Sequence, residues 1–355
     1  MKKFDISNLY SIPKEVRYCK KCVIPNQRPR ITFDKDGICM ACNFAEYKKN
    51  EMDWSAREQE FLKLLDKHRR NDGSHDIVVP SSGGKDSDYV AHRLKFEYGM
   101  NPLTVTWAPH VYTDIGRYNF QALIDSGFDN ILGTPNGEVH RRFTKLCFEE
   151  MGDPFQPFIY GQTWFPVQVA CNYGIQLIMD GENGEMEYGG DPSTDKPGFT
   201  IKDAKKFWFS GRSLDYWLDR GFSKSDMSLY MPPDIDRIGK LGIERHFFSY
   251  YFNWQPQSHY YYARENCGFK PNPDGRSEGT YSKYASLDDK IDGFHFYLML
   301  IKFGFGRATS DAAHELREGL IDREEAVALV RKYDTEFPKK HFQLFLDYCD
   351  MDQDH

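Results

Sequence analysis

The sequence predicts an α/β protein with a doubly wound, mostly parallel five-stranded sheet, a cysteine-containing segment before it and a helical region after it. Three observations support this fold class. Short apolar runs alternate with helical segments from residue 75 onward, a glycine-containing turn joins the first run to a helix, and the C-terminal region has mostly helical patterns. Strands that alternate with helices imply right-handed crossovers and a sheet covered on both faces.

The expected strands are short apolar segments bounded by turn residues. They are residues 75–80, 103–107, 130–133, 175–180 and 246–252, and the main helices between the first four are 88–99, 117–126, 138–151 and 164–173. In a sheet of this kind, ligands bind beyond the carboxyl ends of the strands, near the point where the strand order reverses. The turns that follow the strands are therefore the expected location of function.

The chain is expected to have three parts. They are a small segment over 1–52, an α/β core over 53–270 with an insertion at 191–240, and a helical region over 271–355. Two Ser-x-x-Asp sequences have the form of helix capping boxes. Ser223–Asp226 predicts a short helix over 227–231, and Ser286–Asp289 predicts a helix over 287–303.

The turn after the first strand has the composition of a phosphate-binding loop. Its residues are Ser82, Gly83, Gly84, Lys85, Asp86 and Ser87. Paired glycines let the backbone approach an anion without a Cβ in the way, and the free N–H groups of the following helix point toward that anion. The loop is neither G-x-x-x-x-G-K-[ST] nor G-x-G-x-x-G. An ordinary serine-capped surface turn is the alternative interpretation.

Composition limits the class of protein. The 355 residues carry a formal net charge of −7, which gives no general attraction for nucleic acid. No apolar run approaches the roughly 18 residues that a membrane-spanning helix needs, so we expect no membrane insertion. Residues 1–5 lead into no signal-peptide pattern, and the expected location is therefore cytoplasmic.

Four of the eight cysteines form two pairs, at Cys19 and Cys22 and at Cys39 and Cys42. Two C-x-x-C pairs at this spacing are typical of a zinc ribbon, in which four thiolates surround one tetrahedral ion. A segment with few large apolar residues gains its folding energy from such a metal. An iron–sulfur cluster and unligated thiols are the alternatives.

An acidic turn follows the fourth strand, over residues 180–190. It contains Asp180, Glu182, Glu185 and Glu187 among four glycines, together with Asn183. Carboxylates at this rim of the sheet could hold Mg²⁺ over a polyphosphate or act as a base toward an amine. The amide of Asn183 suits a substrate amide. The position and the composition of the turn together favour the functional reading, and a solvated acidic turn is the alternative. The sequence does not assign roles to the individual glutamates.

Two basic residues of the C-terminal region lie near predicted turns, Lys290 and Arg307. Groups of this kind can fold back onto a phosphate or another substrate anion. We therefore take both as candidate substrate-binding residues. Plain surface charge is the alternative for each of them alone.

The loop Ser82–Ser87 resembles the SGGxDS pyrophosphate loop of the N-type ATP pyrophosphatases. Together with the cysteine pairs and the acidic turn, further strings make the whole chain similar to the N-acetyl sugar amidotransferase family of that superfamily. These strings are residues 181–185, 279–284, 287–293 and 302–309. The resemblance implies an adenine nucleotide alpha hydrolase-like fold and a role in making acetamidino sugars for surface polysaccharides or glycosylated flagellin.

The resemblance also implies a reaction. ATP would bind at Ser82–Ser87, with Asp86 contacting Mg²⁺, and the acetamido oxygen of an N-acetyl sugar would be adenylated. Ammonia would then displace AMP to leave an acetamidino group. The candidate catalytic residues are Lys85, Asp86, Glu182 and Glu185, and the candidate substrate contacts are Asn183, Glu187, Lys290 and Arg307.

The ammonia source is expected to be a separate subunit. The chain has no spare segment of the size of a glutaminase domain. We therefore expect either a glutaminase partner, similar to that of imidazole glycerol phosphate synthase, or free ammonia. The sugar itself, whether free, nucleotide-linked or a nonulosonic acid, is not specified by the sequence.

Two other functions are compatible with the loop. A tRNA-thiolating enzyme would share the loop and the cysteine pairs, but it needs a basic RNA-binding face and usually a catalytic cysteine. Cys147 and Cys171 have no C-x-x-C partner. A non-catalytic nucleotide sensor is the third reading, although an intact Lys-Asp-Ser after the glycines favours catalysis.

Overall fold

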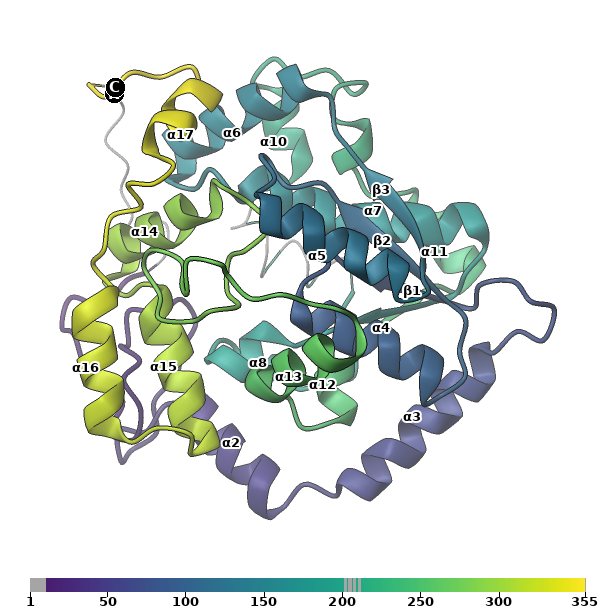
Figure 1. Ribbon diagram of the computed structural model, residues 1–355, viewed down its shortest axis with the longest axis horizontal. Coiled ribbons are helices and arrows are strands. Elements are labelled where there is room, and N and C mark those ends of the chain that lie inside the picture. The colour runs from purple at the N-terminus through teal and green to yellow at the C-terminus, as the bar shows by residue number, and fades with distance from the viewer. Residues whose placement is uncertain (1–10, 201–202, 204–205, 207–208, 210–211, 355) are drawn as a thin grey trace.

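The computed structural model describes residues 11–200, 203, 206, 209 and 212–354, and it confirms the α/β fold class (Figure 1). Its centre is one five-stranded sheet in the order β3-β2-β1-β4-β5, with every neighbouring pair parallel. The strands are β1 (Ile77–Pro80), β2 (Pro102–Trp107), β3 (Asp129–Gly133), β4 (Leu177–Asp180) and β5 (Glu244–Phe247).

Helices make up most of the rest of the described chain. The longer ones are α2 (Met40–Asn50), α3 (Trp54–His68), α4 (Lys85–Phe96), α5 (Asp114–Asp125), α6 (Gly137–Met151), α7 (Gln156–Tyr173), α13 (Pro256–Asn266), α14 (Asp292–Phe303), α15 (Arg307–Glu318) and α16 (Arg323–Tyr333). The shorter ones are α8 (Gly184–Tyr188), α10 (Leu214–Leu218), α11 (Ile235–Leu241), α12 (Phe248–Tyr251), α17 (Phe342–Tyr348) and the 3₁₀ turns η1 (Pro192–Thr194) and η2 (Ser228–Tyr230).

The strand order reverses between β1 and β4. The chain runs outward from β1 through β2 to β3 on one side, and β4 and β5 continue on the other. Ile77 of β1 pairs with Pro102 of β2 and with Leu177 of β4. The carboxyl ends of β1 and β4 are therefore neighbours at the switch point, where sheets of this kind bind their ligands.

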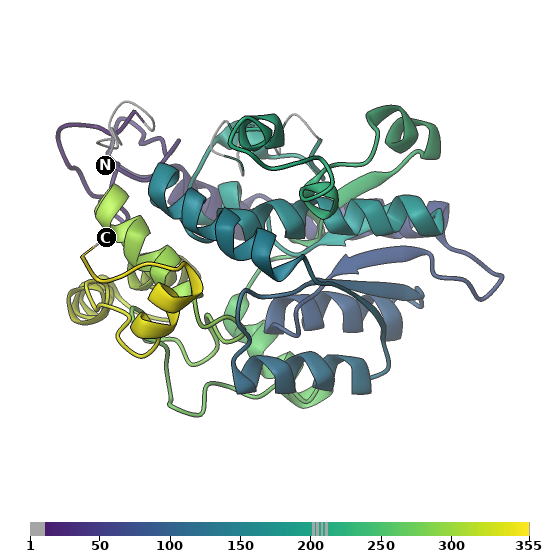
Figure 2. The same ribbon diagram turned by 90° about the horizontal axis from the view of Figure 1, so that it is seen from above.

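Each face of the sheet has its own hydrophobic core because side chains alternate along a strand. Val78 packs with α6 and α7 on one face, whereas Ile77 and Val79 pack with α3, α4 and α5 on the other. Figure 2 shows these two layers of helices on opposite sides of the strands. Both faces are therefore covered, as the alternating pattern of strands and helices predicts.

The fifth strand ends earlier than expected. The prediction of strand over 246–252 is wrong beyond Phe247, because residues 248–251 form the short helix α12. The ring of Phe248 is fully buried, 5.5 Å from the ring of Phe61 in α3. Tertiary packing of the aromatic residues has thus overridden their strand propensity.

The capping-box predictions are also wrong about the helices that should follow them. Asp226 and Ser223 exchange the expected hydrogen bonds, but only the 3₁₀ turn η2 follows. The helix expected from residue 287 begins at Asp292 instead. Ser286 has a left-handed backbone with φ of 55°, so residues 286–291 form a loop.

The three expected parts of the chain pack on one another. Residues 19–42 and α2 share a hydrophobic cluster with α15 and α16 of the C-terminal region, and Figure 1 shows these helices side by side. Phe209 and Trp217 of the expected insertion belong to the same core as β2, α6 and α7. Among the residues that the structure describes, no helix is long and apolar enough to cross a membrane.

Candidate active site

A cavity of about 510 Å³ lies at the switch point of the sheet. Its floor comes from the turns after β1 and β4, and its walls come from α5, α7 and the C-terminal region. The lining includes Ser81–Ser87, Trp107, Gly116, Phe155, Phe158, Asp180–Glu182, Phe199, Arg245, Phe247, Tyr284–Asp289, Asp292, Phe296 and Arg307. The two rim segments expected from the sequence therefore meet in one site.

The loop after β1 has the backbone geometry of an anion cradle. Gly83 has φ of +79°, and a Cβ there would lie 2.5 Å from the backbone nitrogen of Phe120, so this position requires glycine. Helix α4 begins directly after Gly84, and no side chain caps it. The first-turn N–H groups and the positive end of the helix dipole are thus available to a phosphate.

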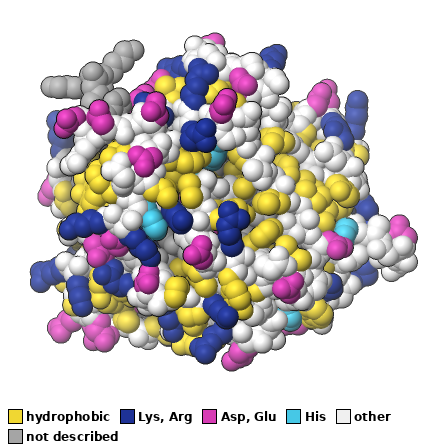
Figure 3. Space-filling view, turned by 45° about the horizontal axis from the view of Figure 1, so that its top comes forward, with side chains coloured by type: hydrophobic (Ala, Val, Ile, Leu, Met, Phe, Trp, Pro, Cys, Tyr) yellow, Lys and Arg dark blue, Asp and Glu magenta, His cyan; other side chains and the backbone are white. Residues whose placement is uncertain are grey.

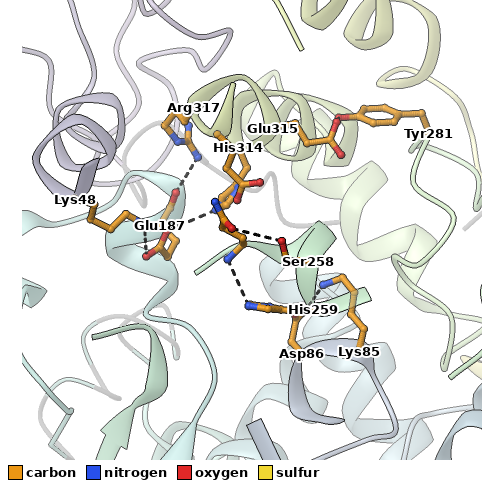
Figure 4. A network of polar contacts seen from close by, with 12 residues as sticks. Lys48, Lys85, Asp86, Glu187, Ser258, His259, Tyr281, His314, Glu315 and Arg317 are labelled. Atoms are coloured by element: carbon orange, nitrogen blue, oxygen red, sulfur yellow. Dashed lines mark hydrogen bonds and ion pairs between the residues drawn. The ribbon is translucent and has the colours of Figure 1, made fainter. Parts of the chain in front are cut away.

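Lys85 and Asp86 form an ion pair on this loop. The Lys85 ammonium lies 2.5 Å from Asp86 Oδ2 and 4.9 Å from the ring centre of Tyr284. The other oxygen, Asp86 Oδ1, lies 2.9 Å from Nδ1 of His259 in α13 (Figure 4). Burial raises the pKa of Asp86, but Lys85 and His259 outweigh it and hold that pKa below the ordinary value. Asp86 is therefore a carboxylate at neutral pH.

The acidic turn contributes two of its residues to the cavity. Asp180 is held by both arms of the Arg245 guanidinium, at 2.5 and 2.8 Å. Glu182 also lines the cavity, and it forms no such ion pair with any residue that the structure describes. Burial raises the pKa of Glu182 to about 7, and the nearby charge of Asp86 adds to the rise. A carboxyl group poised near neutrality is suited to proton transfer.

The structure does not bring the other residues of this turn to the cavity. Glu185 binds the Arg30 guanidinium at 2.5 Å, and Glu187 binds the Lys48 ammonium at 2.6 Å. The amide of Asn183 donates to the Thr194 carbonyl. The physical reason is that α8 starts immediately after Asn183, and the side chains of Glu185 and Glu187 on it contact the N-terminal segment. None of the three is among the residues that line the cavity.

The two basic residues expected to bind substrate, Arg307 and Lys290, lie at different cavities. Arg307 lines the cavity, where its guanidinium lies 2.8 Å from Asp311 and 4.9 Å from the ring centre of Phe296. Lys290 lies instead at a second cavity of about 580 Å³, which is lined by residues of α5 and of the loops 272–278 and 286–290. Of these two residues, Arg307 lines the cavity at the switch point and Lys290 does not.

The C-terminal loop adds acidic residues that the sequence interpretation left without a role. Asp288 and Asp292 both line the cavity. Burial raises the pKa of Asp288 to about 7, and the charges of Asp292 and Asp289 contribute. Both residues lie within the string 287–293 on which the resemblance rests, which is the one signal that could have indicated them.

His259 is another contact that the sequence did not reveal. It lies in a helix rich in aromatic residues and belongs to no motif. Its side chain is 2% exposed, and its ring stacks on Tyr89 of α4 at 4.0 Å. The packing of α13 on α4 brings it to Asp86, and no local pattern encodes that packing.

Asp289 fastens the C-terminal loop to the loop that follows β2. Its carboxylate accepts hydrogen bonds from the backbone and the ring of His110, both at 2.7 Å, and from the backbone N–H groups of Val111 and Ile291. This is the residue that was expected to cap a helix. The loop 286–291 forms because its carboxylate is used across the fold instead.

Replacing Asp289 by alanine is expected to lower the free energy of unfolding by about 3–5 kcal/mol, because several buried donors would lose their acceptor. Urea denaturation would measure the change. Lys290→Ala is the matched control, since its side chain faces the second cavity, and it is expected to change stability by less than about 0.5 kcal/mol. Equal stability of the two variants would contradict the role of Asp289 in fastening the C-terminal loop.

The four cysteines of the N-terminal segment converge on one point. All four sulfurs lie within 4.8 Å of one another, and Cys19–Cys42 and Cys22–Cys39 are 3.9 and 3.7 Å apart. A tetrahedral ion with Zn–S bonds of about 2.3 Å requires sulfurs about 3.8 Å apart. The residues therefore fit a single zinc ion, with no position left open for a substrate.

Buried charges connect this cysteine cluster to the acidic turn (Figure 4). Lys48, on the helix that follows Cys39, forms the ion pair with Glu187. His314 lies 3.5 Å from the same carboxylate, and Arg317 donates to the Glu187 carbonyl at 2.8 Å. The N-terminal segment and α15 thus hold α8 from two sides.

The molecular surface has mixed charge on the face drawn in Figure 3. Lys and Arg side chains lie among Asp and Glu side chains there, with hydrophobic side chains between them. Nucleic-acid binding surfaces instead cluster basic residues on one face or along one stripe. This face does not have that pattern.

Residues 278–355 match the family model described as LPS biosynthesis protein WbpG-like, C-terminal domain. A search of curated proteins finds nothing that matches this chain. The matched segment contributes Tyr284, Asp288, Asp292 and Arg307 to the cavity. The same cavity is therefore lined by the segment that matches the family model and by the loop Ser82–Ser87.

Proposed function

We propose that this protein is an ATP-dependent amidotransferase of surface-polysaccharide biosynthesis that converts an N-acetyl sugar into an acetamidino sugar, AMP and pyrophosphate. One observation carries the proposal. The loop Ser82–Ser87 and the segment similar to a lipopolysaccharide biosynthesis domain face each other across one cavity. A nucleotide-binding element and a sugar-pathway element at one site support a reaction that joins their substrates.

The loop would bind the phosphates of ATP. The amides of the first turn of α4 and the Lys85 ammonium supply the positive charge, and Gly83 leaves room for close approach. Asp86 fits Mg²⁺, because it is an ionised carboxylate at the rim of the cradle. When bound, Mg²⁺ supplies charge neutralisation on the polyphosphate. Lys85 would release Asp86 and follow the developing phosphate charge.

The aromatic walls suit a sugar. Phe155, Phe158, Phe199, Phe247 and Phe296 line the cavity, and binding sites of this kind combine apolar walls with a few polar groups that fix orientation. Arg307 and Arg245 supply such groups. Holding the acetamido oxygen against the α-phosphorus would convert a bimolecular reaction into a unimolecular one.

The chemistry follows in two balanced steps. The acetamido oxygen attacks the α-phosphorus, a P–O bond forms, and the bond to pyrophosphate breaks. Ammonia then attacks the imidate carbon, the C–O bond breaks, and AMP leaves with the former amide oxygen. The proton that the attacking nitrogen loses needs an acceptor, and Glu182 lines the cavity with a pKa raised to about 7. We therefore assign Glu182 as the general base.

The pH dependence tests this assignment. At fixed free ammonia, the rate of amidine formation is expected to rise about tenfold per pH unit below pH 7 and to level off above it, because Glu182 accepts a proton only as a carboxylate. Glu182→Gln is expected to lower the rate by about 10²–10⁴-fold and to remove the inflection.

Asp288→Asn is the control for this pH profile. Asp288 also has a pKa raised to about 7, so it could produce a similar inflection. The variant is expected to keep the inflection of the unmodified protein. If Asp288→Asn removed the inflection and Glu182→Gln retained it, the base would be Asp288 and our assignment would be wrong.

Ammonia is proposed to come from a separate glutaminase subunit. The proposal predicts that the purified chain uses ammonium salts but not glutamine, and that a glutaminase partner restores the use of glutamine. Comparing product formation with the two nitrogen sources would test this. Efficient use of glutamine by the chain alone would refute it.

Product analysis tests the function as a whole. The chain would be incubated with ATP, Mg²⁺, ammonia and a panel of N-acetyl sugars that are free, nucleotide-linked or nonulosonic acids. Mass spectrometry is expected to show AMP, pyrophosphate and a sugar whose mass has changed by replacement of one oxygen with NH. Release of AMP with no such product, or no AMP with any sugar, would contradict the proposal.

The tRNA-thiolation reading gains no support from the cavity. That chemistry usually needs a cysteine at the site, and no cysteine lines the cavity among the residues that the structure describes. The isolated cysteines are all buried in the protein; they are Cys147, Cys171, Cys267 and Cys349. Cys171, a residue of α7, is 4% exposed and belongs to the core on that face of the sheet, as expected of a small packing residue.

A further inference from the structure

We propose that His259 is a positioning residue that fixes the Asp86 carboxylate in the orientation in which it binds Mg²⁺·ATP. This inference rests on the proposed function. It concerns a residue outside the loop motif, on a helix that no sequence pattern connects with nucleotide binding. His259 touches Asp86 and not the cavity, so its effect would be exerted through that carboxylate.

The imidazole ring of His259 is held on several sides. It stacks on Tyr89 with a centroid distance of 4.0 Å and an interplanar angle of 20°, and Trp254 packs against it edge-on at 4.3 Å. The backbone N–H of Gln255 points to Nε2 at 3.4 Å. Since Nε2 accepts this hydrogen bond, the proton lies on Nδ1, which donates to Asp86 Oδ1 at 2.9 Å.

The two partners of Asp86 differ in mobility. The ammonium of Lys85 is at the end of a long, flexible side chain, and it is also the group that would bind the phosphates of ATP. His259 is 2% exposed and held by the packing of α13 on α4. When Lys85 turns to the phosphates, the contact with His259 can persist and keep Asp86 from rotating. Hydrogen bonds of this kind orient metal ligands in many proteins, and their loss weakens metal binding about 10–100-fold.

A packing role for His259 makes different predictions, and two substitutions separate them. His259→Phe keeps the ring that stacks on Tyr89 but removes the donor. His259→Asn removes the ring but keeps an N–H donor at the position of Nδ1. If His259 positions Asp86, the asparagine variant retains function and the phenylalanine variant loses it; if His259 only packs, the order is reversed.

The experiment measures ATP binding by calorimetry with and without Mg²⁺, together with the melting temperature of the nucleotide-free protein. His259→Phe is expected to weaken Mg²⁺-dependent ATP binding about 10–100-fold, to leave Mg²⁺-free ATP binding unchanged and to melt near the unmodified protein. His259→Asn is expected to bind within a few-fold of the unmodified protein. His92→Phe is the matched control, because His92 lies on α4 and bonds Tyr262 rather than Asp86.

The possible results are separable. Mg²⁺-dependent ATP binding by His259→Phe equal to that of the unmodified protein would overturn the inference. Absence of Mg²⁺·ATP binding by the unmodified protein would instead overturn the proposed function on which it rests. Should His259→Phe not fold, His259→Gln replaces it, since glutamine places its N–H at the position of Nε2; equal binding by the asparagine and glutamine variants would then overturn the inference.

Discussion

Replacing Lys85 by alanine is expected to reduce AMP formation by at least about 10²–10³-fold, which is the usual effect of removing one preorganised group that stabilises transition-state charge. Lys85 is the one basic residue of the loop, and its ammonium stands between Asp86 and Tyr284 at the cavity. The other two cations that line the cavity, Arg245 and Arg307, come from β5 and α15 and are paired with Asp180 and Asp311, so neither stands on the phosphate loop. Quantifying AMP by chromatography would measure the loss.

The controls for this prediction separate chemistry from folding. Lys95→Ala removes a lysine from the same helix, where the ammonium bonds the Gly127 carbonyl away from the cavity, and it should leave AMP formation within a few-fold of normal. Lys85→Met keeps the stem of the side chain and removes only the charge, so it should be as inactive as Lys85→Ala. AMP formation at normal rates in both Lys85 variants would remove the loop from the proposed mechanism.

The parts of the site that follow from local chain chemistry could be predicted from the sequence. The glycine turn after β1 is such a part. The positive φ of Gly83 is a conformation that favours glycine, and the residue before α4 is Gly84, which has no side chain to cap the helix. The cysteine pairs are another, since two C-x-x-C sequences leave few arrangements of four sulfurs. That β1 and β4 both end at one rim follows from the alternation of strands and helices.

The orientation of side chains within a turn could not be predicted in the same way. Asp180, Glu182, Glu185 and Glu187 lie within eight residues of sequence, yet only the first two line the cavity. The difference arises from α8 and from the buried cations Arg30 and Lys48, which come from a distant part of the chain. Composition shows that an acidic turn lies at the rim, but only long-range partners decide which carboxylate faces the ligand.

Asp289 and His259 illustrate the same limit. The Ser-x-x-Asp pattern at residues 286–289 is a valid local signal for a helix start. The Asp289 carboxylate is instead bound by His110, on the loop after β2, because the backbone and the ring of His110 both donate hydrogen bonds to one of its oxygens. It is therefore not available to cap a helix. His259 reaches Asp86 only because α13 packs on α4. Contacts between elements far apart in sequence thus determine the positions of Asp86 and of the C-terminal loop at the site.

Loss of one cysteine from the cluster that fits zinc is expected to have the largest effect on the folded protein. Cys39 is fully buried, and α2 begins at the next residue. In Cys39→Ser the segment 11–52 would no longer hold the zinc ion that its four cysteines fit, and binding of a structural zinc ion is worth about 10–16 kcal/mol in small zinc domains. Metal analysis should show loss of zinc, and calorimetry should show an early unfolding transition of this segment.

The same substitution should stop AMP formation, although none of the described cysteines lines the cavity. Without α2, Lys48 leaves Glu187, and the carboxylate stays buried beside His314 and the Arg317 contact. Removing one partner of a buried ion pair costs about 3–5 kcal/mol. Helix α8, which carries Glu187, directly follows the turn that carries Glu182. The acidic turn therefore loses its support before the sheet unfolds.

Two variants distinguish this coupling from general damage. Cys171→Ser changes a buried cysteine of the core and should keep both zinc and activity at a modest loss of stability. Lys48→Met leaves the four cysteines intact and should keep zinc while lowering AMP formation, because it removes only the connection to Glu187. Normal activity in Lys48→Met would show that the zinc segment acts on the site by another route, and normal activity in zinc-free Cys39→Ser would show that it does not act on the site at all.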